Sequence, residues 1–208
     1  MSILALTSDT LIGTAAAGNI EYSSPIFTGT PIGTQRGIVP TQQYYRLNSA
    51  VVGANATGAQ STFGVGVTLS ASTVYEFEIY VILTKTAGTT SHNIGMGIGG
   101  TATLNNIGYS AFGQLTGSAI PVAVSTNNYG YISNTATSTN IFTGATTASF
   151  AVAVLLKGTV SINAGGTFIP QYTLSAAPGG AYSTAIGSFI RIAPVGASGS
   201  NTSVGAWA

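Results

Sequence analysis

Two carboxylates lie two residues apart in the sequence, at Glu76 and Glu78. On an extended strand they would share one face at a separation of about 7 Å, which overlaps the carboxyl spacing of inverting glycosidases. Catalysis by such a pair requires one carboxyl in an apolar pocket that raises its pKa, whereas neighbours on one strand face share one environment. We therefore predict no enzyme, and we expect a solvated strand face or ion pairs with Arg36, Arg46 or Lys85 across a sheet or a subunit contact.

The single histidine, His92, is the other candidate for acid–base or metal chemistry. The four acidic residues of the chain are Asp9, Glu21, Glu76 and Glu78. Together with His92 they show no metal-ligand spacing, the chain has no cysteine, and no G-x-S-x-G nucleophile segment occurs. In the polar stretch 89–93 (TTSHN) we expect His92 to cap a hairpin turn. The sequence thus predicts no catalytic, cofactor-binding or metal-ligating residue.

Residues 95–100 (GMGIGG) satisfy the G-x-G-x-x-G pattern of dinucleotide-binding sites. Such a site also needs a helix that begins at the glycines and an acidic residue about 20 positions further on. No helical pattern follows, and no acidic residue occurs after Glu78. We interpret the stretch as a Gly-rich strand or bulge where two backbones pack closely.

The only tryptophan, Trp207, lies one residue from the C-terminus. Termini usually fray, so a large aromatic residue there predicts docking, either within the chain or on a neighbouring subunit. Residues 55–57 (NAT) and 201–203 (NTS) match the N-glycosylation sequon. No signal-peptide pattern is present, because residues 3–6 form only a short apolar stretch, and we interpret both matches as chance.

Charge is nearly missing from this chain of 208 residues. Five Lys or Arg and four Asp or Glu make 4% of the sequence, where soluble domains carry about 25%. The net charge of +1 excludes a nucleic-acid partner held by a basic patch. With 45% apolar residues the chain is not disordered. Its densest apolar run, residues 150–156, is far shorter than the roughly 20 residues of a membrane-spanning helix, so we expect no membrane insertion.

Strand patterns recur along the sequence, and no window has the spacing of an amphipathic helix. The clearest strand is 73–83 (TVYEFEIYVIL), where every second residue is apolar and shares one face. Residues 148–156 alternate as well, and 159–162 and 167–174 read as a hairpin joined by the Gly-rich turn 163–166. Further strands are expected at 44–47, 63–69, 93–98, 129–132 and 188–192.

Short antiparallel strands separated by turn residues predict an all-β chain with less than about 10% helix, folded as an antiparallel β-sandwich or jelly roll. Residues 1–40 differ from the rest, because Pro25, Pro31 and Pro40 punctuate them. We expect an extended N-terminal arm over residues 1–40 that contacts another subunit or another protein, and a jelly-roll-like sandwich domain over residues 41–208.

Several short segments, taken together, carry a resemblance. A β segment leads into Ala-Gly-x-x-Glu-Tyr, and an aromatic-Pro stretch follows. The segments are residues 4–8 (LALTS), 15–22 (AAAGNIEY), 27–31 (FTGTP), 36–40 (RGIVP), 43–47 (QYYRL), 166–172 (GTFIPQY), 176–180 (AAPGG) and 201–208 (NTSVGAWA). The chain resembles, over nearly its whole length, a tail-fibre-like structural module of virion proteins of tailed bacteriophages, many from aquatic bacteria. Ser23 and Ser24 stand where that family usually has Asp-Gly.

The resemblance implies a non-enzymatic bacteriophage structural protein on the particle exterior, as a capsid decoration or a short fibre. Such a protein is made in the host cytoplasm, is localised to the virion, and has other virion proteins as partners. We expect a homo-oligomer, with a trimer as the leading stoichiometry. The alternative is a receptor-binding tail-fibre module, in which residues 127–131 (NNYGY) stack on a host surface glycan. A third hypothesis, a depolymerase acting through Glu76 and Glu78, requires the catalytic pair argued against above.

Overall fold

The computed structural model describes residues 6–115, 130–142, 147–205 and 207, and these residues form strands and turns with no helix. This confirms the predicted all-β class. The strands are β1 (Ile20–Ser23), β2 (Ile26–Ile32), β3 (Gln35–Val39), β4 (Gln43–Arg46), β5 (Val51–Val52), β6 (Gly58–Ser61), β7 (Val67–Leu69), β8 (Thr73–Lys85), β9 (Ile94–Gly99), β10 (Thr103–Leu115), β11 (Gly130–Ser133), β12 (Thr139–Phe142), β13 (Phe150–Ala164), β14 (Gly166–Leu174), β15 (Ser183–Thr184) and β16 (Phe189–Ala197).

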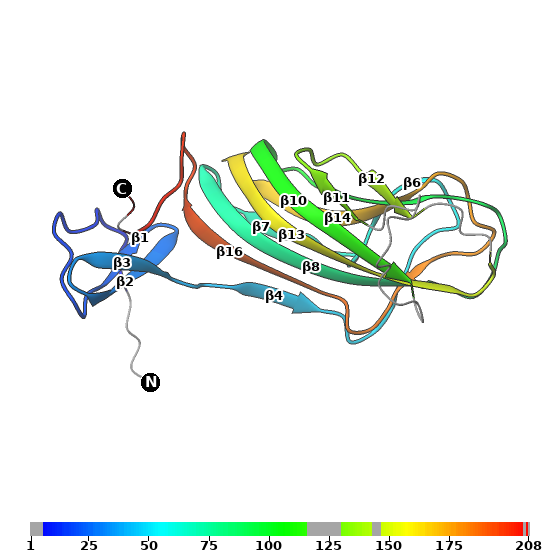
Figure 1. The fold of residues 1–208 in the computed structure, drawn as a ribbon, viewed down its shortest axis with the longest axis horizontal. Helices are drawn as coiled ribbons and strands as arrows, with labels where there is room; N and C mark the ends of the chain where they lie inside the picture. Colours follow the sequence, from blue (N-terminus) through cyan, green and yellow to red (C-terminus); the bar gives the residue numbers. More distant parts are fainter. Residues whose placement is uncertain (1–5, 116–129, 143–146, 206, 208) are drawn as a thin grey trace, which may run out of the picture.

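The strands form an antiparallel sandwich with a small extra sheet at one end (Figure 1). The large sheet has eight strands in the order β11-β10-β13-β8, after which β16 and then β15 pair with successive parts of β8; β4 flanks β16 and β5 flanks β15. The second sheet has five strands in the order β12-β9-β14-β6, with β7 also on β14. The N-terminal sheet has the order β1-β2-β3.

The core lies between the large and the second sheet because apolar residues alternate along their strands. Burial along β8 alternates as the sequence predicts. The buried set is Tyr75, Phe77, Ile79, Val81 and Leu83. From the second sheet, Phe168 of β14 reaches the same layer, and its ring lies 5.4 Å from that of Phe77. Alternation with period two therefore places one face of each sheet in the core.

The predicted hairpin over residues 159–174 is wrong. Strand β13 runs without a break to Ala164, and it pairs with β8 and β10 in the large sheet. Strand β14 pairs with β6, β7 and β9 in the second sheet. Gly165 thus lies at a corner where the chain passes from one sheet to the other. The two strands look like a hairpin in the sequence because both alternate, and alternation does not say which neighbour a strand has.

The predicted strand at 63–69 is wrong for its first half, and Pro170 explains why. The carbonyl of Pro170 accepts a hydrogen bond from the Thr62 N–H, so the backbone of Pro170 faces the gap between β6 and β7. Proline has no N–H to donate back. Residues 62–66 therefore leave the ladder, with Gly64 at a left-handed φ of +69°, and pairing with β14 resumes only at β7.

The structure has a strand at each of the remaining predicted positions. The segments 44–47, 93–98, 129–132 and 188–192 overlap β4, β9, β11 and β16, although residue 129 lies outside the described residues.

The N-terminal arm carries a sheet that the sequence analysis did not predict. Among the described residues, β1, β2 and β3 pair only with one another. The rings of Tyr22 and Phe27 stack at 4.4 Å on this sheet. Pairing with the sandwich starts at β4, which lies along β16. The arm is thus a small unit at the end of the molecule rather than a bare extended segment (Figure 1).

Replacing Phe168 tests the core. Phe168 is fully buried against Phe77, so Phe168→Ala should lower the free energy of unfolding by about 3–5 kcal/mol, through lost burial and the cavity left behind. Urea unfolding followed by circular dichroism measures the change. The matched control is Ile186→Ala at an exposed site, which should stay within about 0.5 kcal/mol. Equal effects of the two variants would contradict the sandwich core.

Candidate functional site

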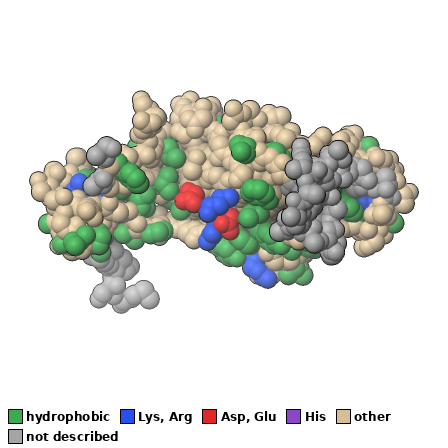
Figure 2. Space-filling model, in the orientation of Figure 1, with side chains coloured by type: hydrophobic (Ala, Val, Ile, Leu, Met, Phe, Trp, Pro, Cys, Tyr) green, Lys and Arg blue, Asp and Glu red, His purple; other side chains and the backbone are tan. Residues whose placement is uncertain are grey.

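Glu76 and Glu78 lie on the outer face of the large sheet, the face turned away from the second sheet. The Glu78 carboxylate accepts a hydrogen bond from Arg191 Nη2 at 2.7 Å. On the other side of β8, Lys157 of β13 is the cross-strand neighbour of Glu78. Figure 2 shows the red and blue side chains gathered in the middle of this face. Both carboxylates lie on this one sheet face, as the sequence predicts; Glu76 is exposed, and Glu78 is partly buried beside Arg191.

Within one chain, Glu78 pairs with Arg191, and neither glutamate pairs with the expected Arg36, Arg46 or Lys85 in the described residues. Arg36 pairs instead with Glu21 in the N-terminal sheet. Arg46 donates to Asn48 Oδ1 at 2.5 Å, and Lys85 is buried at the far end of β8. The actual partner comes from β16 because the antiparallel register places residue 191 beside residue 78. Register between strands more than 100 residues apart is not visible in the sequence.

The hairpin turn expected at His92 is also wrong, because the loop that carries it joins β8 to β9 in the other sheet, and only 2% of the residue is exposed. Its Nδ1 lies 2.7 Å from the Thr90 carbonyl, which can only accept, so Nδ1 carries the proton. Its Nε2 then accepts from the Tyr182 hydroxyl at 2.8 Å. Both ring nitrogens are therefore used inside the fold, and His92 is a structural residue.

Two tyrosines extend this buried group. The ring of Tyr182 meets that of Tyr172 edge-on at 6.4 Å, and the Tyr172 hydroxyl donates to Gln60 Oε1 at 3.0 Å. Burial raises the pKa of the Tyr172 phenol to about 12. Burial, with Tyr172 close by, also raises the pKa of Tyr182. The neutral phenols are thus the forms that the fold stabilises.

Lys85 lies beside this group and is 3% exposed. Its Nζ donates to the carbonyls of Gly88 at 2.6 Å and Thr147 at 2.5 Å, and lies 6.0 Å from the Tyr182 ring centre. Burial lowers the pKa of Lys85. The ammonium joins two loops at one end of the sandwich, which gives this lysine a structural role.

Residues 95–99 lie in strand β9, as predicted, and Gly100 follows its end. A Cβ added at Gly97 would lie 2.7 Å from Ser138 Cα, and one at Gly95 would lie 2.6 Å from Ser138 Oγ. The glycines therefore allow the segment before β12 to pack closely on β9. No helix starts at these residues, so the requirement for a dinucleotide site is not met.

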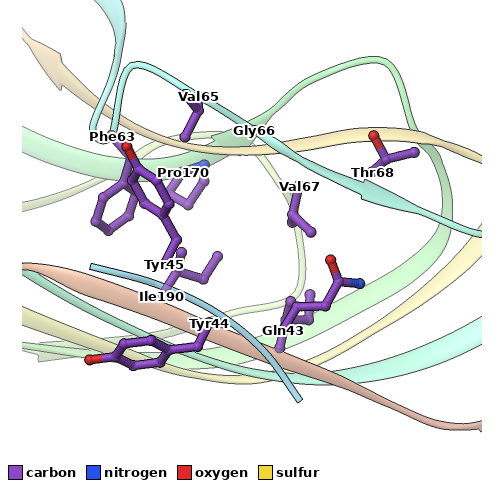
Figure 3. A pocket seen from close by; sticks show the side chains of 11 residues that line it. Gln43, Tyr44, Tyr45, Phe63, Val65, Gly66, Val67, Thr68, Pro170 and Ile190 are labelled. Carbon is purple, nitrogen blue, oxygen red and sulfur yellow. The ribbon is translucent and has the colours of Figure 1, made fainter. Parts of the chain in front are cut away.

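A hollow of about 360 Å³ opens at the side of the sandwich, between β4 and the segment that precedes β7 (Figure 3). Its lining residues are Gln43, Tyr44, Tyr45, Phe63, Val65, Gly66, Val67, Thr68, Pro170, Ile190 and Ile192. Phe63 and the two isoleucines are buried, whereas Tyr45 and Val65 are exposed at the rim. The lining carries no charged side chain. The hollow is therefore suited to a neutral, largely apolar occupant.

The side chains around the hollow come from both layers of the sandwich. In Figure 3, Tyr45, Phe63 and Pro170 lie together on one side, and Gln43 lies across the space below Val67. The Tyr45 ring meets the Phe63 ring edge-on at 6.1 Å. The Tyr44 ring points the other way, to the outer face, where it stacks on Phe189 at 5.7 Å.

An ion pair organises the N-terminal sheet. Glu21 accepts from Arg36 Nε at 2.7 Å and from Arg36 Nη2 at 3.2 Å, and it also accepts from the Ile12 N–H at 2.8 Å. Arg36 Nη2 donates to the Ile12 carbonyl as well. The Arg36 guanidinium and the Ile12 N–H hold the pKa of the Glu21 carboxyl below its usual value. This network joins β1, β3 and the chain that precedes them.

The opposite face of the N-terminal sheet is apolar and exposed. The register places Ile20 beside Gly29 and Gly37, and Phe27 between Tyr22 and Val39. Ile20 is 67% exposed and Val39 is 42% exposed. The two glycines keep the face flat. This flat face, defined by Ile20, Tyr22, Phe27 and Val39, is called the end face below.

Two further predicted positions have been placed. Asn55, in one of the glycosylation matches, accepts through Oδ1 from the Gly179 N–H at 2.9 Å. Of the tyrosine-rich segment 127–131, the first three residues lie outside the described residues. Tyr131 is half-buried on β11, and its hydroxyl donates to the Met96 carbonyl at 2.9 Å. Tyr131 is therefore part of the sandwich rather than a free ring for stacking on sugar.

Clusters of metal-ligating residues and membrane spans were not found in the described residues. No group of three or more His, Cys, Asp or Glu side chains lies close enough there to hold a metal ion. In the same residues, no helix is long and apolar enough to cross a membrane.

Comparison with family models, with curated proteins and with solved structures finds no match to this chain.

Sequence reasoning missed the two surfaces that stand out in the structure, the end face and the hollow. The end face has a signal in the sequence, since Ile20, Tyr22, Phe27 and Val39 are apolar residues in a segment read as an arm. The hollow has a signal in Pro170, because a proline inside a strand pattern marks a break in pairing.

The buried phenols predict a loss of stability in alkali. The pKa of Tyr172 is raised to about 12 in the folded state, and the pKa of Tyr182 is raised as well, so their contribution to stability is present below about pH 10 and is lost as the pH rises through the folded-state values. Because the pKa of Lys85 is lowered in the folded state, this lysine makes the free energy of unfolding rise with pH only up to about pH 10.4, its unfolded value. Above that pH only the tyrosines change the free energy of unfolding, so the two effects can be told apart. Urea midpoints between pH 8 and 12 measure this.

Variants assign the alkaline loss to the buried group. Tyr172→Phe should reduce the loss of stability above about pH 10, because one phenol that resists ionisation is removed. Tyr44→Phe, on the outer face, is the matched control and should follow the wild type. An unchanged slope in Tyr172→Phe would contradict the role given to this phenol.

Proposed function

We propose that this chain is a non-enzymatic structural protein on the exterior of a bacteriophage particle, as a capsid decoration or a short fibre, and that it assembles as a homo-oligomer, with a trimer as the leading stoichiometry. The end face carries this proposal. Apolar residues on a flat sheet face, outside the core and at one end of an elongated molecule, are typical of an attachment surface.

The position of the segment that follows β16 supports attachment at this end. Figure 1 shows the N-terminal sheet and this segment at the same end of the molecule. Of the thirteen large hydrophobic residues that are exposed in the described part of the chain, five lie within residues 6–39, and Trp207 is a sixth. The rest of the sandwich then projects away from the particle. The resemblance to virion modules of tailed phages points to the same class of protein.

The distribution of charge supports a homo-oligomer. Five of the nine charged residues lie on the outer face of the large sheet. They are Arg46, Glu76, Glu78, Lys157 and Arg191. Asp9, Glu21 and Arg36 belong to the N-terminal unit, and Lys85 is buried. Most of the remaining surface holds hydroxyls, amides and small apolar groups, which copies of the chain can pair without desolvating charges.

Charged residues on the end face test attachment. Ile20→Asp with Val39→Asp should lower the number of copies per virus particle at least about tenfold, because two carboxylates would have to be desolvated against the particle. Both sites are exposed, so the chain should stay folded. Quantitative mass spectrometry of purified particles that encode this chain gives the copy number, and a cryo-electron microscopy map gives its place.

The matched control is Val52→Asp, an exposed apolar site in β5 of the sandwich. This variant should be incorporated like the wild type. Normal incorporation of the end-face variant would contradict attachment through this sheet. Absence of the wild-type chain from the particle surface would contradict the proposed function itself.

The charge distribution also predicts how the oligomer responds to salt. Since its interfaces would contain few ion pairs, dissociation should be nearly the same in 0.05 M and about 1 M NaCl, where the Debye length falls to about 3 Å. Analytical ultracentrifugation across this range measures it. A chain that sediments as a 20.8 kDa monomer at micromolar concentration would contradict the oligomer. An oligomer that dissociates at high salt would contradict the uncharged interface.

A further inference from the structure

The indole of Trp207 is presented to solvent. Trp207 is 80% exposed, in the segment that follows β16. Its Nε1–H donates to the Val204 carbonyl at 2.9 Å. The only polar group of the side chain is therefore already paired within its own chain. An indole held in this way can enter an apolar site without leaving an unpaired donor behind.

The hollow has the matching properties. A cavity of about 150 Å³ holds benzene, so a volume of about 360 Å³ accommodates the larger indole ring system. Its lining is uncharged, and Tyr45 and Phe63 offer ring faces and edges for aromatic contact. The floor of Ile190 and Ile192 supplies apolar contact.

We propose that Trp207 of one copy of this chain inserts into the hollow of a second copy. This contact goes beyond the proposed role on the virion and holds whichever particle site the oligomer occupies. A tryptophan in a pocket is the typical anchor of a protein interface, because it buries a large area at low cost in conformational entropy.

The occupant is a second copy because Trp207 lies away from the hollow of its own chain. No residue after Ile192 lines the hollow. A Cβ at Gly205 would lie 3.3 Å from the Arg36 carbonyl, so the segment with Trp207 runs along the N-terminal unit. In Figure 1 the segment that follows β16 leads toward β1–β3, whereas β4, which borders the hollow, runs along the sandwich.

Such a contact is heterologous, since each copy contributes one tryptophan and one hollow. A heterologous contact closes into a ring when its rotation allows and otherwise continues as a filament. Closure after three copies would give the trimer proposed above. The contact itself does not depend on that number.

The experiment uses the single tryptophan as its own probe. Two variants each remove one half of the contact. Val65→Glu places a carboxylate at the rim of the hollow, at a residue that is 47% exposed and outside any strand. Trp207→Ala keeps the hollow and removes all tryptophan fluorescence. Ile132→Ala, the loss of an 89% exposed side chain on β11, is the matched control.

Dilution of the wild-type chain gives the first readout. We expect the emission of Trp207 to be red-shifted in dilute samples and blue-shifted as copies associate. Both half-contact variants should raise the dissociation constant at least about thirtyfold, the effect of losing an interface anchor, and Ile132→Ala should not. Emission that is blue-shifted at every concentration would mean that the ring is buried in its own chain, and it would overturn the proposal.

Mixing the two variants gives the second readout. The Val65→Glu chain has a tryptophan and a blocked hollow, and the Trp207→Ala chain has an open hollow and no signal. Titration of Trp207→Ala into Val65→Glu should therefore blue-shift the tryptophan emission, and the shift should reach a plateau when every tryptophan occupies a hollow. No shift would overturn the proposal. An equal loss of association in Ile132→Ala would overturn it as well, because association would then depend on exposed apolar area in general.

Discussion

The antiparallel ladder between β8 and β13 fixes both faces of the large sheet at once. Every residue from Thr73 to Lys85 has a partner on β13. Because side chains alternate with period two, a shift of one residue would bring Glu76 and Glu78 into the core and move Phe77 into solvent. The same register that buries the aromatic core therefore sets out the charged row on the outer face. Because the chain has only nine charged residues and five of them lie on this outer face, the rest of the surface is almost uncharged.

A single missing donor shapes the other side of the sandwich. Pro170 lies in β14 between the parts that pair with β6 and β7. The Pro170 carbonyl accepts a hydrogen bond from the Thr62 N–H, but proline has no N–H that could donate a second hydrogen bond to Thr62. The segment 62–66 therefore curves away from the sheet, and the hollow opens beneath it. The break in pairing thus follows from backbone chemistry, whereas the apolar lining of the hollow comes from side chains such as Phe63 and Ile190.

The sequence predicts which face of a strand each side chain occupies, but it does not predict which strands pair with one another. Alternation correctly placed Phe77 in the core and Glu76 outside, since period two follows from the geometry of one strand. The hairpin predicted at 159–174 is wrong because the pairing of a strand depends on every strand that could lie beside it, and not on the strand's own pattern. His92 was expected to cap a hairpin turn because its neighbours are polar, whereas Tyr182, 90 residues away, completes its hydrogen bonds inside the fold. The end face and the hollow were not predicted for the same reason, since each is formed by residues that come together only through strand pairing.

The segments that carry the resemblance to phage virion modules have structural roles in this chain. Glu21 and Arg36, from two of these segments, form the ion pair that holds the N-terminal sheet, and this network leaves the apolar end face on the other side. Pro170, from a third, opens the hollow, and Trp207, from a fourth, is the ring proposed to fill it. A tryptophan exposed to water and a hollow open to water are each unfavourable alone. One contact between copies would account for both, and it would explain why these distant segments occur together.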